Sequence, residues 1–225
     1  MRIVSLVPSV TETLSAWGVE PTACTRFCER PDLPHVGGTK NPDIEAIVGL
    51  APDLVVVDQQ ENRREDAEAL TAAGLHVLAL DVRSVERLAE DLAPLAAAVG
   101  VDQPFDDRPA MPPIGARAFV PIWRRPWMTF GGNTFGSSML AILGVANVYA
   151  DATVDYPTVE LSDVDRHTID VVLVPSEPYE FTAAHLDELR AVAPVVRVDG
   201  QDLFWWGARI PAAVERLHAA ITAAI

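Results

Sequence analysis

Two stretches of the chain share one order of polar and apolar positions. They are Asn41–Asp58, NPDIEAIVGLAPDLVVVD, and a looser copy at Tyr156–Pro175, YPTVELSDVDRHTIDVVLVP. In each copy a proline, Pro42 or Pro157, followed by a glutamate predicts the start of a short helix. Each copy then passes through an aspartate into four consecutive aliphatic residues. Such a run is typical of a strand that is buried on both faces, as in a parallel sheet.

The segments around the two copies repeat as well, with a strand and a helix upstream and a helix and a strand downstream. This plan predicts an α/β fold with two similar Rossmann-like lobes, mainly parallel sheets and a ligand cleft between the lobes. The expected boundaries are an N-terminal lobe at 1–82, an interlobe helix and connector at 83–115, and a C-terminal lobe at 116–225. Helical spacing predicts a helix over Val85–Val99, and four prolines in Val101–Ile114 indicate an extended connector.

Composition narrows the range of partners. The 225 residues are 49% hydrophobic and 22% charged, with a net charge of −15, which disfavours nucleic acid because its readers carry basic patches. No apolar stretch reaches the roughly 18 residues that span a bilayer. The strand Ile3–Val7 follows the first two residues without the apolar core of a signal peptide. The sequence as written therefore predicts a cytoplasmic protein, or an extracytoplasmic one if a leader has been removed.

Catalytic and metal-binding motifs are lacking. The two cysteines, Cys24 and Cys28, are too few for a structural zinc site, and we expect buried or partly buried thiols. No zinc-protease motif, nucleophile elbow or phosphate-binding loop occurs. We therefore expect no enzyme, no resident metal and no intrinsic cofactor. The histidines are scattered along the chain at His35, His76, His167, His185 and His218.

Polar residues follow the expected strands of the N-terminal lobe. Ser9 and Glu12 follow the first strand, and ligands of open α/β sheets bind beyond the carboxyl ends of strands. Alternatively Ser9 or Thr11 caps the next helix and Glu12 serves its backbone, an arrangement that this pattern favours over ligand contact. Cys28 lies in a loop rich in proline and glycine, and Asp58–Gln60 end the repeated strand and face the expected cleft.

Aromatic residues gather in two loops of the C-terminal lobe. Trp123 and Trp127 flank two arginines, and such a group can stack on a flat ligand and pair with its carboxylates; alternatively one tryptophan fills the core. A helix expected to start near Thr134 offers N–H groups to an anion. Of the run Phe204–Trp206, we expect at least one ring to be exposed. Ser176, Glu177 and Tyr179 occupy the place of Asp58–Gln60 in the second copy.

The stretches RIVSLVPSVTE, GGTKNPDIEAIVGLAPDLVVVD, WRRPWMTFGGNTF, the second repeat with SEPYEF, and DGQDLFWWGAR together resemble the helical-backbone substrate-binding proteins of ABC importers. These receptors bind cobalamin, haem or ferric siderophores. The resemblance implies two lobes that move little on binding and a corrinoid or metal chelate held by aromatic and polar loop residues. The predicted ligand-binding residues are Ser9, Phe27, Cys28, Asp58, Gln59, Gln60, Trp123, Trp127, Asn133, Thr134, Phe135, Glu177, Tyr179, Trp205, Trp206 and Arg209.

Three functions follow as hypotheses. The first is a binding protein for a cobalamin-like or other metal-chelate ligand, with an ABC permease as its partner if the protein is exported. The second is a chelatase-like enzyme acting on such a ligand. The third is a protein-interaction module that uses the aromatic residues to bind a partner.

Overall fold

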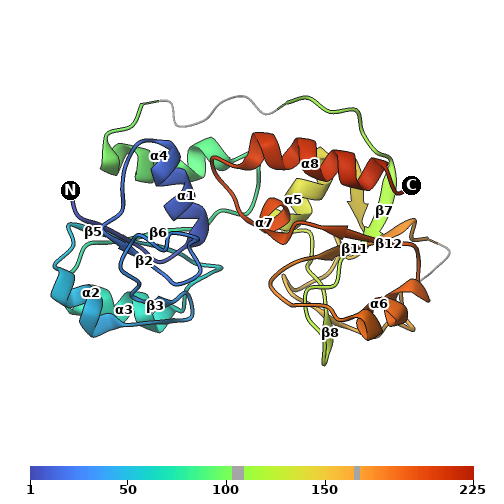
Figure 1. The fold of residues 1–225 in the computed structure, drawn as a ribbon, viewed down its shortest axis with the longest axis horizontal. Helices are drawn as coiled ribbons and strands as arrows, with labels where there is room; N and C mark the ends of the chain where they lie inside the picture. Colours follow the sequence, from blue (N-terminus) through green and yellow to red (C-terminus); the bar gives the residue numbers. More distant parts are fainter. Residues whose placement is uncertain (103–108, 165–167) are drawn as a thin grey trace. The chain divides into compact units, whose positions relative to one another are not determined.

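The computed structural model describes residues 1–102, 109–164 and 168–225. Residues 103–108 of the expected connector, and His167 with its two preceding residues in the second repeat, lie outside the described part. The chain forms two compact units (Figure 1). Unit 1 holds the described residues of Met1–Val82, Arg87–Asp106 and Trp206–Arg209, and unit 2 those of Arg83–Glu86, Asp107–Trp205 and Ile210–Ile225. The two units therefore exchange short segments, and the simple boundaries expected from the sequence stay a prediction.

Unit 1 is built on a four-stranded parallel sheet in the order β2-β1-β5-β6. Helices α1 and α4 cover one face of this sheet and α2 and α3 the other (Figure 1). Alternation along β1 sends Val4 to the α2 and α3 side, where it packs with Ile47 and Leu70. The elements are β1 (Ile3–Ser5), α1 (Pro8–Ala16), β2 (Ala23–Cys24), the hairpin strands β3 (Gly37–Gly38) and β4 (Asn41–Pro42), α2 (Ile44–Leu50), β5 (Leu54–Asp58), α3 (Arg64–Ala72), β6 (Val77–Leu80) and α4 (Leu88–Val99).

Unit 2 repeats this plan with a parallel sheet in the order β12-β11-β7-β9. Strands β8 and β10 form a separate two-stranded antiparallel sheet. The elements are β7 (Ala116–Phe119), β8 (Trp127–Met128), α5 (Phe135–Ile142), β9 (Val145–Asn147), β10 (Thr158–Val159), β11 (Val171–Pro175), α6 (Ala183–Arg190), β12 (Val195–Val198), α7 (Gly200–Phe204) and α8 (Ile210–Thr222). The expected α/β fold with parallel sheets is confirmed.

The aspartate before the repeated strand makes the same two hydrogen bonds to the backbone in both copies. The Asp53 carboxylate accepts a hydrogen bond from the Arg2 N–H at 2.6 Å, and the Asp53 N–H donates to the Arg2 carbonyl at 2.8 Å. Asp170 makes the same two bonds with Arg117, at 2.7 and 2.9 Å. Each aspartate therefore fixes the register between the first strand of its unit and the repeated strand, which explains why both copies carry it.

Several helix boundaries differ from those expected. The helix predicted after Pro157 is wrong, because Thr158–Val159 pairs with β8 and places Val159 in the core beside Trp127. In the first copy Pro42 is the last residue of β4 and does not belong to the helix. The Asp43 carboxylate caps α2 by accepting from the Ala46 N–H at 3.0 Å.

Two further boundaries were wrong. The helix expected from Val85 begins at Leu88, since the Val85 N–H donates to Ser138 Oγ in unit 2 instead of joining a helix. Near the C-terminus, Phe204 belongs to the short helix α7 and not to a loop, with the Asp199 carboxylate as the cap.

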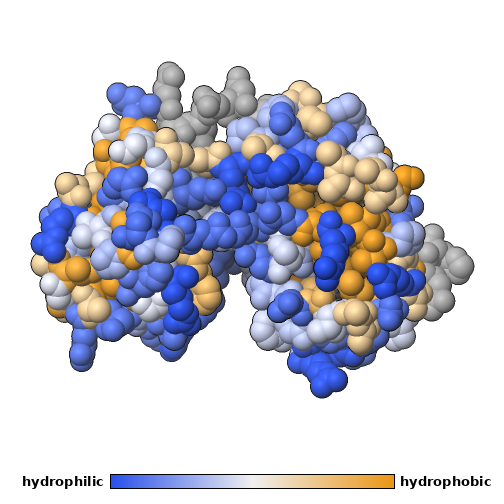
Figure 2. Space-filling view, in the orientation of Figure 1, coloured by the Kyte–Doolittle hydropathy of each residue, from blue (hydrophilic) through white to orange (hydrophobic). Residues whose placement is uncertain are grey.

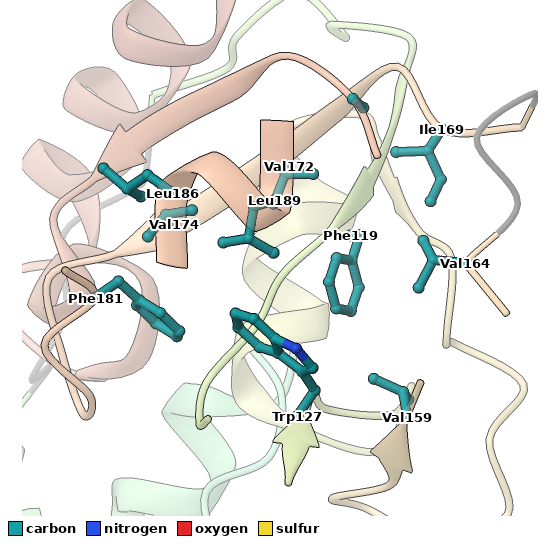
Figure 3. Close-up of a cluster of buried hydrophobic side chains, with 11 residues drawn as sticks. Phe119, Trp127, Val159, Val164, Ile169, Val172, Val174, Phe181, Leu186 and Leu189 are labelled. Atoms are coloured by element: carbon teal, nitrogen blue, oxygen red, sulfur yellow. The ribbon is translucent and has the colours of Figure 1, made fainter. Parts of the chain in front are cut away.

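The core of unit 2 on its α6 side packs three aromatic rings among aliphatic side chains (Figure 3). Trp127 lies parallel to Phe181, with ring centroids 5.9 Å apart and planes 9° apart. Phe119 from β7 and Leu189 from α6 close the same cluster. The alternative in which one tryptophan fills the core therefore holds for Trp127, whose exposed fraction is 5%.

Candidate functional site

In each unit the strand order reverses next to the first strand. The reversal lies between β1 and β5 in unit 1 and between β7 and β11 in unit 2. At such a switch point the loops after the two strands diverge to opposite faces and leave room for a ligand beyond their carboxyl ends. Most of the residues predicted to bind ligand come from the loops that follow these strands or the strands next to them. The topology therefore brings them to one edge of the sheet within each unit.

The edge of unit 1 carries Phe27, Gln59 and Gln60 near its surface. Phe27 is 51% exposed, and the Arg26 guanidinium lies 4.8 Å from its ring centroid. Gln59 is exposed, while the half-buried Gln60 donates through Nε2 to Asp81 Oδ1 at 3.1 Å, and its backbone carbonyl accepts from Lys40 Nζ at 2.9 Å. An exposed ring beside amide side chains can contact a partly apolar ligand with polar substituents.

Asp58 lies under this edge and holds the loop. Its carboxylate accepts from the Gln60 N–H at 2.8 Å and from the Val82 N–H at 3.3 Å. Burial raises the pKa of Asp58 to about 6, against the opposing effect of these backbone donors. With an exposed fraction of 1%, the side chain serves the conformation of the loops after β5 and β6.

Asn62 is a loop-holding residue that sequence reasoning missed. Its Oδ1 accepts from the Asp58 N–H at 2.8 Å, and its Nδ2 donates to the carbonyls of Leu6 and Thr39 at 3.1 and 2.9 Å. One buried amide thus joins the loops after β1, β3 and β5. The only signal in the sequence is an Asn shortly after a strand, which is common in turns. Asn147 plays a similar role in unit 2, bonding Phe130 O and Ser137 Oγ.

The helix after β1 begins differently from the expectation. Helix α1 starts at Pro8 with Val7 as its N-cap and no side-chain cap, so the predicted capping by Ser9 or Thr11 is wrong. Proline at the first helical position had offered the better rule. Ser9 Oγ instead accepts from the Trp206 N–H at 3.3 Å.

The Glu12 carboxylate binds the Arg209 side chain and not the helix backbone. Its two carboxylate oxygens take a forked pair of hydrogen bonds from the Arg209 guanidinium, at 2.7 and 3.0 Å. Trp206 and Arg209 therefore attach the segment Trp206–Arg209 to α1 inside unit 1.

In unit 2 the switch point is marked by an aromatic contact. Trp123, after β7, is 44% exposed, and its ring meets Tyr179, after β11, edge to face with centroids 5.0 Å apart. Arg124 has partners inside unit 2. Its guanidinium lies 4.6 Å from the centroid of the Trp127 ring and forms an ion pair with the Glu188 carboxylate at 2.8 Å. Trp123 and Tyr179 are thus the rings on this edge that have free area for a ligand.

The other predicted residues of unit 2 have partners within the unit. The Trp205 indole N–H donates to the Glu177 carboxylate at 2.7 Å, and Trp205 is 8% exposed. Thr134 caps α5, as expected for a helix starting there, with its oxygen 3.4 Å from the Ser137 nitrogen. Exposed Asn133 donates to Asp155 at 3.3 Å.

The sixteen predicted residues therefore fall into three groups, and their contact with ligand stays a prediction. Phe27, Gln59, Trp123 and Asn133 are exposed, and Gln60, Glu177, Tyr179 and Arg209 are half-buried. Of the aromatic run Phe204–Trp206, only Phe204 is partly exposed. The buried residues are Ser9, Cys28, Asp58, Trp127, Thr134, Phe135, Trp205 and Trp206.

Within the described residues, no group of three or more His, Cys, Asp or Glu side chains is placed to hold a metal ion. In the same residues no helix has the length and apolarity needed to cross a membrane. Both cysteines are buried free thiols, as expected. Hydrophilic residues cover much of the visible surface, with one hydrophobic area on unit 2 over β11 and β12 (Figure 2).

Comparison with known proteins shows which families this chain resembles. The profile of the family described as periplasmic binding protein matches residues 3–107. The vitamin B12-binding protein of Salmonella choleraesuis is 27% identical over 182 residues, covering 72% of this chain and 68% of that protein. The vitamin B12-binding protein of Yersinia pestis is 28% identical over 193 residues, covering 77% and 69%. The chain is therefore similar to the periplasmic binding proteins over residues 3–107 and to the vitamin B12-binding proteins over most of its length.

Solved structures show the same fold. The periplasmic vitamin B12 binding protein BtuF of Vibrio cholerae superposes with a TM-score of 0.75 at 19% identity, covering 99% of this chain and 97% of that one. A periplasmic haem-binding protein from Pseudomonas aeruginosa gives a TM-score of 0.79 at 19% identity, covering 99% and 92%. The resemblance read from the sequence motifs is confirmed.

Proposed function

We propose that this protein binds a corrinoid of the cobalamin type and delivers it to an ABC importer. The observation that carries the proposal is the similarity to proteins named vitamin B12-binding protein, at 27–28% identity over 72–77% of the chain. The haem-binding structures share less sequence and support the fold alone. A corrinoid therefore comes before haem or a ferric siderophore as the expected ligand.

The exposed rings at the two switch-point edges support a large, partly apolar ligand. Trp123 and Phe27 stand among the few large hydrophobic side chains of the described residues that remain exposed. Exposing such rings costs free energy that a ligand recovers by covering them. A ligand that covers the exposed 44% of Trp123 removes roughly 100 Å² of apolar surface from water, worth about 2 kcal/mol.

The test is a titration of the purified protein with cobalamin, cobinamide and haem, following tryptophan fluorescence and the visible spectrum of each ligand. Saturable one-to-one binding of a corrinoid is expected. Trp123→Ala should weaken it about 30-fold, which corresponds to the free energy above. Phe27→Ala should weaken it by a comparable factor, since 51% of the Phe27 residue is exposed and a similar apolar area is covered.

Trp17→Phe is the matched control. Trp17 is the C-cap of α1 and so lies at the amino edge of the sheet, opposite the edge that carries Phe27. Its replacement should leave corrinoid affinity unchanged. No saturable binding of either corrinoid would reject the proposal, and saturable binding of haem alone would replace its ligand. Trp205 and Trp206 are unsuitable for this test because both are buried and their loss would disturb the fold.

The remaining parts of the proposal concern turnover, partner and location. We propose binding without chemical change, which is tested by recovering the ligand unaltered after prolonged incubation. We also propose an extracytoplasmic location and an ABC permease as partner, since structures that resemble this chain are named periplasmic. Fractionation of the source cells and co-purification with a permease test these two points. A cytoplasmic pool that still binds corrinoid would favour a carrier instead.

A further inference from the structure

Lys40 is the only lysine among the 17 lysine and arginine residues of the chain. It lies in the two-residue turn between β3 and β4, next to the loop after β5 at the edge of unit 1 that carries Phe27. Its exposed Nζ donates to the backbone carbonyl of Gln60 at 2.9 Å. A lysine ammonium has three N–H donors, so two of them remain for a ligand at this edge.

Arg26 lies against the same hairpin. Its Nη2 donates to Asn41 Oδ1 at 3.5 Å, and a Cβ added to Gly38 would lie 3.0 Å from Nη2 and 3.1 Å from Cζ of the guanidinium. Gly38 therefore leaves room for the guanidinium beside the backbone of β3. Because Gly38 and Asn41 are the pair that closes the turn holding Lys40, the two cations flank one turn.

The two cations differ from other basic residues of unit 1 in having no acidic neighbour. Arg30, Arg63 and Arg64 pair with carboxylates at 2.7, 3.6 and 2.7 Å. Within the described residues, neither Arg26 nor Lys40 forms such an ion pair. The chain as a whole has a net charge of −15, which repels an anionic ligand. Two unpaired positive charges at this edge oppose that repulsion locally.

The anionic group of a corrinoid that such cations can bind is its phosphate. Cobalamin carries a phosphodiester in the chain that links the corrin ring to its nucleotide base, whereas the other side chains of the ring end in uncharged amides. Cobinamide is truncated before this phosphate. Phosphate oxygens accept charge-assisted hydrogen bonds from ammonium and guanidinium N–H groups, and these bonds are roughly twice as strong as those between neutral groups.

We propose that Lys40 and Arg26 bind the phosphate of the ligand, so that this protein prefers corrinoids that carry a phosphate over truncated ones. The inference rests on the corrinoid proposal above and adds a specificity to it. The half-exposed Phe27 ring, whose centroid lies 4.8 Å from the Arg26 guanidinium, offers apolar surface next to the cations. One edge of unit 1 can therefore contact both the phosphate and the apolar groups beside it.

The test compares cobinamide with cobinamide that carries a terminal phosphate, because the two share the same ring and the same cobalt ligands. The native protein should bind the phosphate form at least about tenfold more tightly. Lys40→Met and Arg26→Met should each lower this ratio of affinities at least about threefold. Lys40→Arg keeps the positive charge and should keep most of the preference. Circular dichroism shows whether each variant retains the fold.

Arg2→Met is the matched control. Arg2 is exposed and precedes β1, so it lies at the amino edge of the same sheet, and its two bonds to Asp53 use only its backbone. The change in net charge equals that of Lys40→Met, yet the ratio of the two affinities should stay that of the native protein. This control separates a contact at the ligand edge from a general effect of charge.

Acetylation of the native protein gives a second readout that needs no variant. Mass spectrometry follows one side-chain amine, since Lys40 is the only lysine. At equal saturation, the phosphate form should slow acetylation of Lys40 several-fold more than cobinamide does. Equal affinity for the two corrinoids, equal protection of Lys40, or equal effects of Lys40→Met and Arg2→Met would overturn this inference and leave the proposed function standing. Binding of neither corrinoid would overturn both.

Discussion

Gly207 is the residue on which the attachment of the segment Trp206–Arg209 to α1 depends. Its φ of +100° is unfavourable for any residue with a side chain. A Cβ at this position would overlap Thr13 Oγ1, which lies on α1 and accepts from the Ala208 N–H at 3.3 Å. Thr13 is fully buried, so its hydroxyl has no free space into which to rotate. Gly207→Ala therefore combines backbone strain with a steric clash.

The magnitude follows from these two parts. The positive φ costs about 1–2 kcal/mol for alanine. Displacing Thr13 costs about 1–3 kcal/mol for overpacking and about 1 kcal/mol for the lost hydrogen bond. We expect a total loss of about 3–6 kcal/mol in the free energy of unfolding, or roughly 6–24 °C in Tm for a chain of this size. Urea denaturation followed by circular dichroism and a thermal scan measure both quantities.

Gly74→Ala is the matched control. Gly74 has a φ of +85° but nothing within 4 Å of a built Cβ, so its replacement carries the backbone cost alone, about 1–2 kcal/mol. The double variant Gly207→Ala with Thr13→Ala should be less unstable than the sum of the single changes, because the clashing oxygen is gone. Recovery should stay partial, since Thr13 Cβ lies 3.2 Å from the added carbon. Equal losses for Gly207→Ala and Gly74→Ala would refute this reasoning.

Three further outcomes separate structural from surface roles. Trp127→Ala should cost about 3–5 kcal/mol of unfolding free energy and Trp123→Ala less than about 1 kcal/mol, because only the first ring lies in the core; equal costs in denaturation would contradict the assignment. The raised pKa of Asp58, about 6, means that folding takes up a proton between pH of roughly 4 and 6. The stability of the native protein relative to Asp58→Asn should therefore rise by up to about 3 kcal/mol as the pH falls through that window, and a fall would be the wrong sign. Arg216→Met should lower the free energy of unfolding by about 1–3 kcal/mol, because it leaves the buried Asp202 carboxylate without the guanidinium that lies 2.6 Å away. Arg190→Met, which breaks the exposed pair with Asp187, should lower it by less than about 0.5 kcal/mol.

The sequence predicted secondary structure correctly where that structure depends on neighbouring residues. The run Leu54–Val57 and its counterpart from Val171 are both central parallel strands, as their unbroken aliphatic runs predict. The turn chemistry at Thr134 also placed a helix start correctly. Such signals depend on backbone hydrogen bonds and alternation within a few residues, and these are set by the sequence nearby.

Local pattern was a poor guide where an element is fixed by a distant partner. Thr158–Val159 reads as the start of a helix but is a strand, since pairing with β8 buries Val159 against Trp127. Which tryptophan is exposed was equally beyond local reading: Trp123 and Trp127 are four positions apart, yet one is 44% and the other 5% exposed. Asn62, which joins three loops, carries almost no signal in the sequence.

The amino-acid order alone predicts a repeated α/β chain, the central strands of its sheets and the family that it resembles. Which of the aromatic and polar residues at the strand ends have surface to offer a ligand depends on the folded chain. The fold also places Cys28 and Glu12 in internal hydrogen bonds, with Thr25 and Arg209. The physical reason is that strand formation follows from neighbouring residues, whereas burial and hydrogen-bond partnership are set by residues that the fold brings from far along the chain.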